Sequence, residues 1–493
     1  MAKMSEWIDK IHEHEKSSDS KKESVLGKTK KLFDKLNGKS QDLKGMVNEN
    51  PKKALWSMAI PSFFSLLCLS LNGLVDSIFV SECGSASLIG VGIIQSIFVI
   101  IVGFGAGLSV ATNSSLSYAI SKYTSRDYAR KIVDNSIVLT LIIGIILSVV
   151  LILILKPLLL ALNIYEPAIE PALIYGYILF GGNVFFFFAA VIPAILKATG
   201  EITKTTYALA STSLLNILLD YILIHELGYG VFGAAIATVF CSALCCGLLI
   251  FFMVRSKNIE ITLYDTIFDH DWSIMKKIFH DSIPVTFESI ILSLFGFLAN
   301  VIFNLLNSPP DLAAFIASYK VYCFLIIPIV AIAEGNVTIV AYLFGQDNFE
   351  KMKDLLKYEV KIGCLISAVL WVMVLVFNNQ ITHLFVVNND MAEIAALNFA
   401  LPALNILLMI MPLGLISVSV LQGIQRYKES FIISTIRSVV LEILFGFIAV
   451  LVFHDVVMVY LGIILGGLLG CLLATYKTQR ILSWQINKKE EEC

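Results

Sequence analysis

Apolar stretches long enough to cross a bilayer recur twelve times along the chain, separated by polar segments. A transmembrane helix needs about 20 mainly apolar residues. In the first half, such stretches lie near residues 54–80, 86–118, 134–155, 170–193, 204–224 and 229–254. In the second half, they lie near residues 281–306, 312–342, 358–377, 393–421, 430–452 and 456–482. The pattern predicts an all-α integral membrane protein with twelve transmembrane helices.

The composition agrees with a chain whose solvent is the bilayer. Hydrophobic residues make up 57% of the 493 residues and charged residues 15%, whereas soluble domains are about 25% charged. The net charge of −2 gives no basic field for nucleic acid. The nine cysteines follow neither zinc-site nor disulfide spacing. We therefore expect contact with lipid, no nucleic-acid partner and no protein-bound cofactor.

Lysine and arginine are distributed unevenly between alternate connections. If the N-terminus is cytoplasmic, the inner connections contain most of these residues, Lys197 and Lys204 among them, and the outer connections contain only Lys156. Cationic connections stay in the cytoplasm during membrane insertion. With an even number of spans, we expect a multi-pass protein of the cell membrane with both termini in the cytoplasm.

The two halves of the chain resemble each other. Ile60-Pro61 opens the first apolar stretch, and Ile283-Pro284 opens the seventh, 223 residues later. Transporter repeats of the same orientation are related by an axis along the membrane normal, and the substrate route lies at their interface. We therefore predict two six-helix lobes, over residues 53–254 and 281–482, joined by a cytoplasmic linker over residues 255–280. A polar cytoplasmic extension over residues 1–52 precedes them, and a cytoplasmic tail over residues 483–493 follows them.

The N-terminal extension contains no apolar run long enough to cross a membrane. Apolar residues alternate with lysines in its segment 25–36. This alternation is compatible with an amphipathic helix on anionic lipid and also with a solvated tail.

Few polar side chains interrupt the apolar stretches of the first half. Asp76 lies near the outer end of the first stretch, Asn216 and Asp220 lie on the fifth, and Thr238 lies on the sixth. Asn216 and Asp220 are four residues apart and share one face of a helix. With about 1.5 Å of helix per residue, all four side chains fall in the outer half of the membrane and can meet.

A carboxylate within a membrane requires a partner, a cavity or a function. Two neighbouring carboxylates in a low dielectric do not both stay ionised, so Asp76 and Asp220 would take up a proton or hold a cation between them. A simpler interpretation is that each aspartate caps a nearby helix end or makes a local hydrogen bond. The spacing alone is equally compatible with both.

The second half contains more charged residues within its apolar stretches, namely Glu288, Lys320, Glu334, Arg437 and Glu442. Arg437 and Glu442 are five residues apart, which aligns them poorly on one α-helical face, so we expect their partners on other helices. The group predicts a polar network between helices. Glu288 and Glu334 are also candidates for contact with protons or cationic substrates.

Signatures of enzymes and nucleotide-driven pumps are missing from the sequence. Gly27-Lys-Thr29 and Gly38-Lys-Ser40 resemble the ends of phosphate-binding loops, but both lack the glycine that begins such a loop. No Gly-x-Ser-x-Gly nucleophile motif occurs. We therefore expect no enzymatic activity, and an ion gradient is the remaining source of energy for transport.

Four motifs follow one another as they do in the MATE (multidrug and toxic compound extrusion) transporters: Ile60-Pro61, Asn72-Gly-Leu-Val-Asp76, Gly103-Phe-Gly-Ala-Gly107 and Leu196-Lys-Ala-Thr-Gly200. The similarity covers about residues 52–482. The chain resembles the archaeal and bacterial members of this family, within the multidrug/oligosaccharidyl-lipid/polysaccharide exporter superfamily. The resemblance implies two six-helix lobes arranged as a V, in a monomer that exports organic cations in exchange for protons or sodium by alternating access.

The resemblance also implies a cation-coupling site in the first lobe. Related transporters build it from an Asp on span 1, an Asn-x-x-x-Asp on span 5 and a Thr on span 6, the positions of Asp76, Asn216, Asp220 and Thr238. Tyr175 matches a tyrosine near that site, and Pro61 matches a proline about which the first helix bends. Members with a sodium site in the second lobe use acids on spans 7, 8 and 10, and span 10 here has no acid after Glu393. We therefore do not expect sodium there.

A flippase of lipid-linked oligosaccharides, from the same superfamily, is the alternative function. Such a protein would present several arginines to a diphosphate, and only Arg437 lies within a predicted span. An exporter of organic cations is the favoured interpretation.

Overall fold

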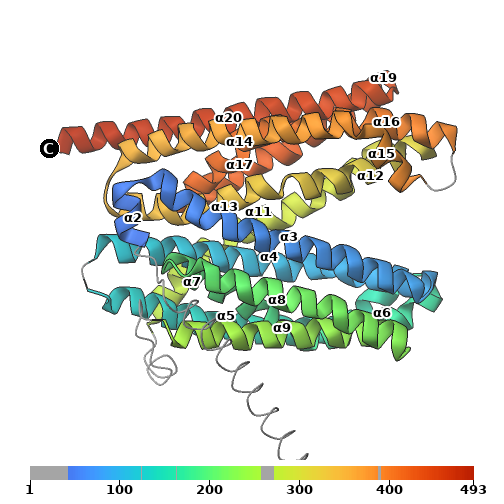
Figure 1. The fold of residues 1–493 in the computed structure, drawn as a ribbon, viewed down its shortest axis with the longest axis horizontal. Coiled ribbons are helices and arrows are strands. Elements are labelled where there is room, and N and C mark those ends of the chain that lie inside the picture. Colours follow the sequence, from blue (N-terminus) through green and yellow to red (C-terminus); the bar gives the residue numbers. More distant parts are fainter. Residues whose placement is uncertain (1–42, 124, 163, 257–270, 387–389, 493) are drawn as a thin grey trace, which may run out of the picture. The chain divides into compact units, whose positions relative to one another are not determined.

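The computed structural model describes residues 43–123, 125–162, 164–256, 271–386 and 390–492, with side chains as far as residue 487. Regular structure within these ranges is entirely helical (Figure 1). In the described part of the chain, 11 helical segments are long and apolar enough to cross a membrane, and one bent pair of helices brings the number of spans to 12. The prediction of an all-α membrane protein with twelve spans is confirmed. The predicted amphipathic segment 25–36 lies outside the described residues.

The spans of the first half are formed by α3 (Pro51–Glu82), α4 (Ser85–Lys122), α5 (Asp127–Ala161), α6 (Glu166–Gly181), α7 (Asn183–Ala198), α8 (Ile202–Asp220), the π-helical turn η1 (Tyr221–Glu226) and α9 (Gly230–Val254). The fourth span, expected near residues 170–193, is formed by two helices, because α6 and α7 meet at an angle of 48°. Gly182 at this bend packs so closely against α9 that a Cβ atom would lie 2.5 Å from Val239 Cγ1. A larger residue at the bend would force the Val239 side chain to move.

The second half contains α11 (Trp272–Asn304), α12 (Pro309–Leu325), α13 (Ile327–Gly345), α14 (Phe349–Val376), α15 (Asn378–Phe385), α16 (Met391–Asn405), α17 (Leu407–Gly423), α18 (Tyr427–Thr435), the π-helical η2 (Ile436–Ile443), α19 (Leu444–Phe453) and α20 (Val456–Glu492). α11 begins before the predicted start near residue 281, because the Asp271 side chain caps it by accepting hydrogen bonds from the Ser273 and Ile274 N–H groups. The eighth and tenth spans are each divided into two helices, at Ile326 and Ile406.

The halves meet where α4 packs on α11 and α13 and where α3 packs on α13 (Figure 1). Gly103 and Gly107 of α4 leave no room for a Cβ atom beside α11, which is how small residues allow membrane helices to approach closely. The amide of Asn113 and the hydroxyl of Thr338, 225 residues apart, exchange hydrogen bonds of 3.0 and 3.1 Å. This separation is close to the spacing of the sequence repeat, so α4 and α13 meet through corresponding positions of the two halves.

The short helix α2 (Leu43–Glu49) contacts both halves. The Lys44 ammonium donates hydrogen bonds to the carbonyl oxygens of Ile120 and Ser121, at the end of α4. The Asn48 side chain accepts a hydrogen bond from Gln346, in the second half. Because Val47 is fully buried, this end of the predicted polar extension is packed against the spans.

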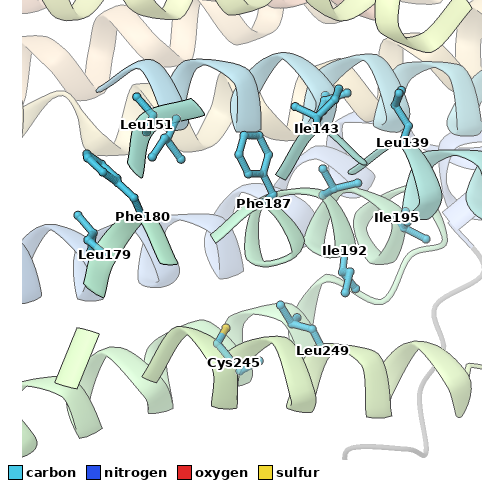
Figure 2. Close-up of a cluster of buried hydrophobic side chains, with 14 of the residues drawn as sticks. Leu139, Ile143, Leu151, Leu179, Phe180, Phe187, Ile192, Ile195, Cys245 and Leu249 are labelled. Atoms are coloured by element: carbon cyan, nitrogen blue, oxygen red, sulfur yellow. The ribbon is translucent and has the colours of Figure 1, made fainter. Parts of the chain in front are cut away.

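Apolar side chains form the core of the first half (Figure 2). Leu151 of α5, Phe180 of α6, Phe187 of α7 and Leu249 of α9 contribute to this cluster from four helices. Cys245 belongs to the same cluster as a small buried residue. The core fixes the helices that line the candidate site described below.

Glu359 of α14 is an exception to the rule that buried polar groups have partners. Its side chain is fully buried, and neither carboxyl oxygen has a hydrogen-bond partner among the described residues. An unsatisfied buried polar group costs about 1–3 kcal/mol. We predict that Glu359→Met, which fills the same space without polar atoms, raises the melting temperature of the purified protein in detergent.

Glu288 is the matched control for this prediction. It is also buried, but its carboxylate accepts hydrogen bonds from Ser430, Ser434 and Gln422. Glu288→Met leaves these donors unsatisfied and should lower the melting temperature. A lower melting temperature for Glu359→Met as well would contradict the assignment of Glu359 as an unsatisfied group.

Candidate functional site

A cavity of about 500 Å³ lies among α3, α4, α7, α8 and α9, with one wall residue, Glu334, from α13. Its lining is mostly apolar and small, with aromatic side chains from Phe98 and Phe186. Among its described lining residues, only Lys197 and Glu334 carry a charge. The cavity is large enough for a small organic molecule.

Lys197 lies elsewhere than the sequence indicated. We expected it in a cytoplasmic connection, but it belongs to the last turn of α7 and lines the cavity. Its Nζ atom lies 2.6 Å from Glu334 Oε2. The two residues are 137 positions apart, so nothing in the local sequence pointed to this ion pair.

A polar cluster adjoins the cavity and contains the predicted coupling residues. Asp76 comes from α3, Asn216 and Asp220 come from the end of α8, and Thr238 comes from α9. Asp76 and Asp220 are both buried and close enough to interact electrostatically. The buried Tyr175 of α6 lies near both aspartates and near Thr238. The structure thus brings Tyr175 and the four predicted residues together.

Local helix geometry positions these side chains. Asn216 and Asp220 share a face of α8, where the Asn216 Nδ2 atom lies 3.5 Å from Asp220 Oδ1. Directly after Asp220, the helix continues as the π-helical turn η1, a distortion that is frequent at functional sites. The Thr238 hydroxyl donates a 2.9 Å hydrogen bond to the Ala234 carbonyl oxygen of its own helix, which leaves its oxygen lone pairs as acceptors.

Asn72 also belongs to the cluster, although we did not predict it as a site residue. Its Nδ2 atom donates a hydrogen bond of 2.9 Å to Asn216 Oδ1. The signal was present in the sequence, since Asn72 lies four residues before Asp76 and therefore one helical turn away on the same face.

The cluster has more acceptor atoms than donors. Within the described residues, Asn72 Oδ1, Asp76 Oδ1 and Asp220 Oδ2 are buried and have no hydrogen-bond partner. Oxygen atoms of this kind are the ligands of hard cations, and a proton on either carboxyl group would also supply a donor. The arrangement fits the binding of a proton or a monovalent cation.

Pro61 lies away from this cluster, on the same helix as Asp76 but near its other end. α3 runs unbroken through Pro61. The Pro61 carbonyl oxygen accepts hydrogen bonds from the hydroxyl groups of Ser65, 3.1 Å away, and Thr206, 3.0 Å away. A bend at this proline remains a prediction.

The acids of the second half occupy different environments. Glu288 accepts hydrogen bonds from three residues of the second half, so we interpret it as part of a structural network. Glu334, in contrast, faces the cavity. Arg437 and Glu442 are buried and interact electrostatically. We had judged their spacing of five unfavourable for an α-helix, but they lie in η2, where π-helical hydrogen bonds join residues five apart.

A bundle of twelve helical spans with a cavity beside buried acids is the architecture of a membrane transporter. The family model MatE matches the chain twice, over residues 61–222 and 284–448. The chain therefore belongs to the MatE family, whose members are transporters and not enzymes.

Curated relatives and solved structures agree with this assignment. The chain is 22% identical to the "Probable multidrug resistance protein NorM" of Thermotoga maritima over 350 residues, which cover 70% of this chain and 75% of the relative. It is 22% identical to the "Multidrug export protein MepA" of Staphylococcus saprophyticus over 392 residues, or 79% of this chain and 85% of the relative. The structure of a multidrug resistance MATE family transporter in an outward-facing conformation superposes with a TM-score of 0.87 and 26% identity, covering 91% of this chain and 100% of that chain.

We predict that a proton or a sodium ion binds at the polar cluster and thereby stabilises the folded protein. A ligand that binds the folded state alone, at 100 times its dissociation constant, adds about 2.7 kcal/mol. Either added sodium, or a change from mildly alkaline to mildly acidic pH, should therefore raise the melting temperature of the wild type more than that of Asp76→Asn or Asp220→Asn. Differential scanning fluorimetry in detergent measures the shift.

Two controls accompany this measurement. Choline chloride at the same concentration separates sodium binding from ionic strength. Glu82→Gln removes an exposed acid from the end of α3, the helix that contains Asp76, and should keep the wild-type response to sodium. Equal shifts in all four proteins would show that the cluster does not bind the ion.

Proposed function

We propose that this transporter exports small organic cations in exchange for a proton or a sodium ion. The observation that carries the proposal is the position of Asn72, Asn216 and Thr238, which belong to the polar cluster and also line the cavity. An ion at Asp76 and Asp220 and a substrate in the cavity would therefore meet the same three side chains. The names of the relatives, which refer to multidrug resistance and export, support a drug-like substrate.

In the proposed cycle, ion binding at the polar cluster competes with substrate binding in the cavity. From the outer side, an ion binds between Asp76 and Asp220 and draws Asn72, Asn216 and Thr238 toward it. The cavity contracts as α3 shifts against α8, and the substrate leaves. The ion then escapes to the cytoplasm after the lobes rock, and a new substrate enters. One charge that crosses a potential of 100 mV supplies about 2.3 kcal/mol.

The proposal includes the predicted topology. The sequence repeat and the distribution of basic residues support two six-helix lobes with both termini in the cytoplasm. The arrangement of the lobes as a V and the monomeric state are implied by the family resemblance. The alternative, a flippase of lipid-linked oligosaccharides, receives less support. The described lining of the cavity contains no arginine, and the one lysine is already paired with Glu334.

Gradient-driven export by reconstituted protein tests the proposal. We expect wild-type proteoliposomes to move ethidium against its gradient when either a proton or a sodium gradient is imposed. Asp76→Asn and Asp220→Asn should each reduce the rate at least about tenfold, because the loss of one charge-assisted ligand costs about 1.5–3 kcal/mol. Glu82→Gln at matched protein content should transport at the wild-type rate.

Two results would contradict the proposal. Normal transport by both aspartate variants would make the cluster structural. Failure of the wild type to move ethidium under either gradient, while the protein remains folded, would favour lipid-linked substrates.

A further inference from the structure

The ion pair between Lys197 and Glu334 occupies the cavity in which the substrate is expected. The atoms Lys197 Nζ and Glu334 Oε2 are 2.6 Å apart, and both side chains face the cavity. The Lys197 side chain is 17% exposed and that of Glu334 is 35% exposed. The acid is thus the more accessible partner, and the lysine neutralises it from the side of α7.

The energetics of the pair depend on the apolar cavity around it. A charge without a partner in such an environment is strongly unfavourable. With both residues present, the empty cavity is close to neutral. The Glu334 carboxylate is already paired with the Lys197 ammonium, so an organic cation can bind the carboxylate only by displacing the ammonium.

A lysine side chain can dissociate from a carboxylate and bind it again reversibly. Its ammonium is a compact charge on a flexible four-carbon stem, unlike the rigid fork of arginine. It also resembles the class of ligand proposed for this cavity, because both are alkylated nitrogen cations. We infer that Lys197 is a resident counter-ion of Glu334, and that an organic cation binds Glu334 in exchange for it. This inference rests on the proposed function.

The exchange has a structural consequence. Lys197 belongs to the first half and Glu334 to the second, so a substrate that displaces Lys197 also breaks a charged link between α7 and α13. The neighbouring link, in which the Tyr342 hydroxyl donates a 2.7 Å hydrogen bond to the Ala198 carbonyl oxygen, stays in place. Lys197 therefore sets the affinity for cations, while the neutral contact keeps the helices together.

Equilibrium binding to the purified full-length protein, without any gradient, tests the inference. The probes are ethidium and its uncharged reduced form, dihydroethidium, which share the same ring system. Lys197→Met removes the competitor and should bind ethidium about tenfold more tightly than the wild type. Glu334→Gln should bind ethidium about tenfold more weakly. Both variants should bind dihydroethidium within about twofold of the wild type.

The double variant Lys197→Met/Glu334→Gln is the matched control. It restores a neutral cavity, so it should bind ethidium and dihydroethidium with similar affinity, and its melting temperature shows whether the ion pair is needed for folding. Unchanged or weaker ethidium binding by Lys197→Met would overturn the inference and leave the lysine a purely structural link. Binding of an anionic dye that depends on Lys197 would also overturn it, since the cavity would then select anions.

The binding assay separates this inference from the proposed function. If the variants show the expected affinities but the wild type does not export ethidium under a gradient, the proposed function fails and the counter-ion role stands. If the wild type exports ethidium and Lys197→Met binds it no more tightly, the counter-ion role fails alone.

Discussion

Hydrocarbon offers no hydrogen bonds, so each polar atom within the membrane needs a partner from the protein itself. Helices satisfy the backbone of every span. Most buried polar side chains that we describe have a hydrogen-bond partner within the protein, as Asn113 has in Thr338 and Glu288 in Ser430. The exceptions to this rule are informative, because a polar atom without a hydrogen-bond partner in the membrane lowers the stability of the folded protein.

The exceptions beside the cavity are the ones that suggest a function. Asn72, Asp76 and Asp220 leave acceptor atoms without donors, next to a space large enough for a small molecule. Glu359 also lacks partners but is not part of the cavity lining, so we interpret it as a cost to stability. A cation or a proton at the cluster would provide a partner for these acceptor atoms. Its binding would also affect the cavity, because Asn216 and Thr238 belong to both.

The same constraint explains which predictions from sequence succeeded. Spans are visible in a sequence because about 20 apolar residues are required whatever the neighbours are. Depth and helical spacing allowed Asp76 and Asp220 to meet, and the family resemblance favoured it over separate helix caps. The bend at Gly182 was not predictable, because the apolar stretch alone is compatible with one unbroken span, and the contact of Gly182 with Val239 of α9 is visible only in the fold. Lys197 was misplaced because a basic residue near the end of an apolar stretch looks like part of a connection, and its partner lies far away in the sequence.

If the ion and the substrate exclude each other, as we propose, their competition can be measured by equilibrium binding. The dissociation constant of ethidium should be determined with the purified protein in the presence and absence of saturating sodium, and at mildly alkaline and mildly acidic pH. A coupling free energy of about 1.4 kcal/mol corresponds to a tenfold change in affinity. We predict that one of the two ions weakens ethidium binding about tenfold, and that Asp76→Asn abolishes the effect. An affinity of the wild type that neither ion changes would contradict it.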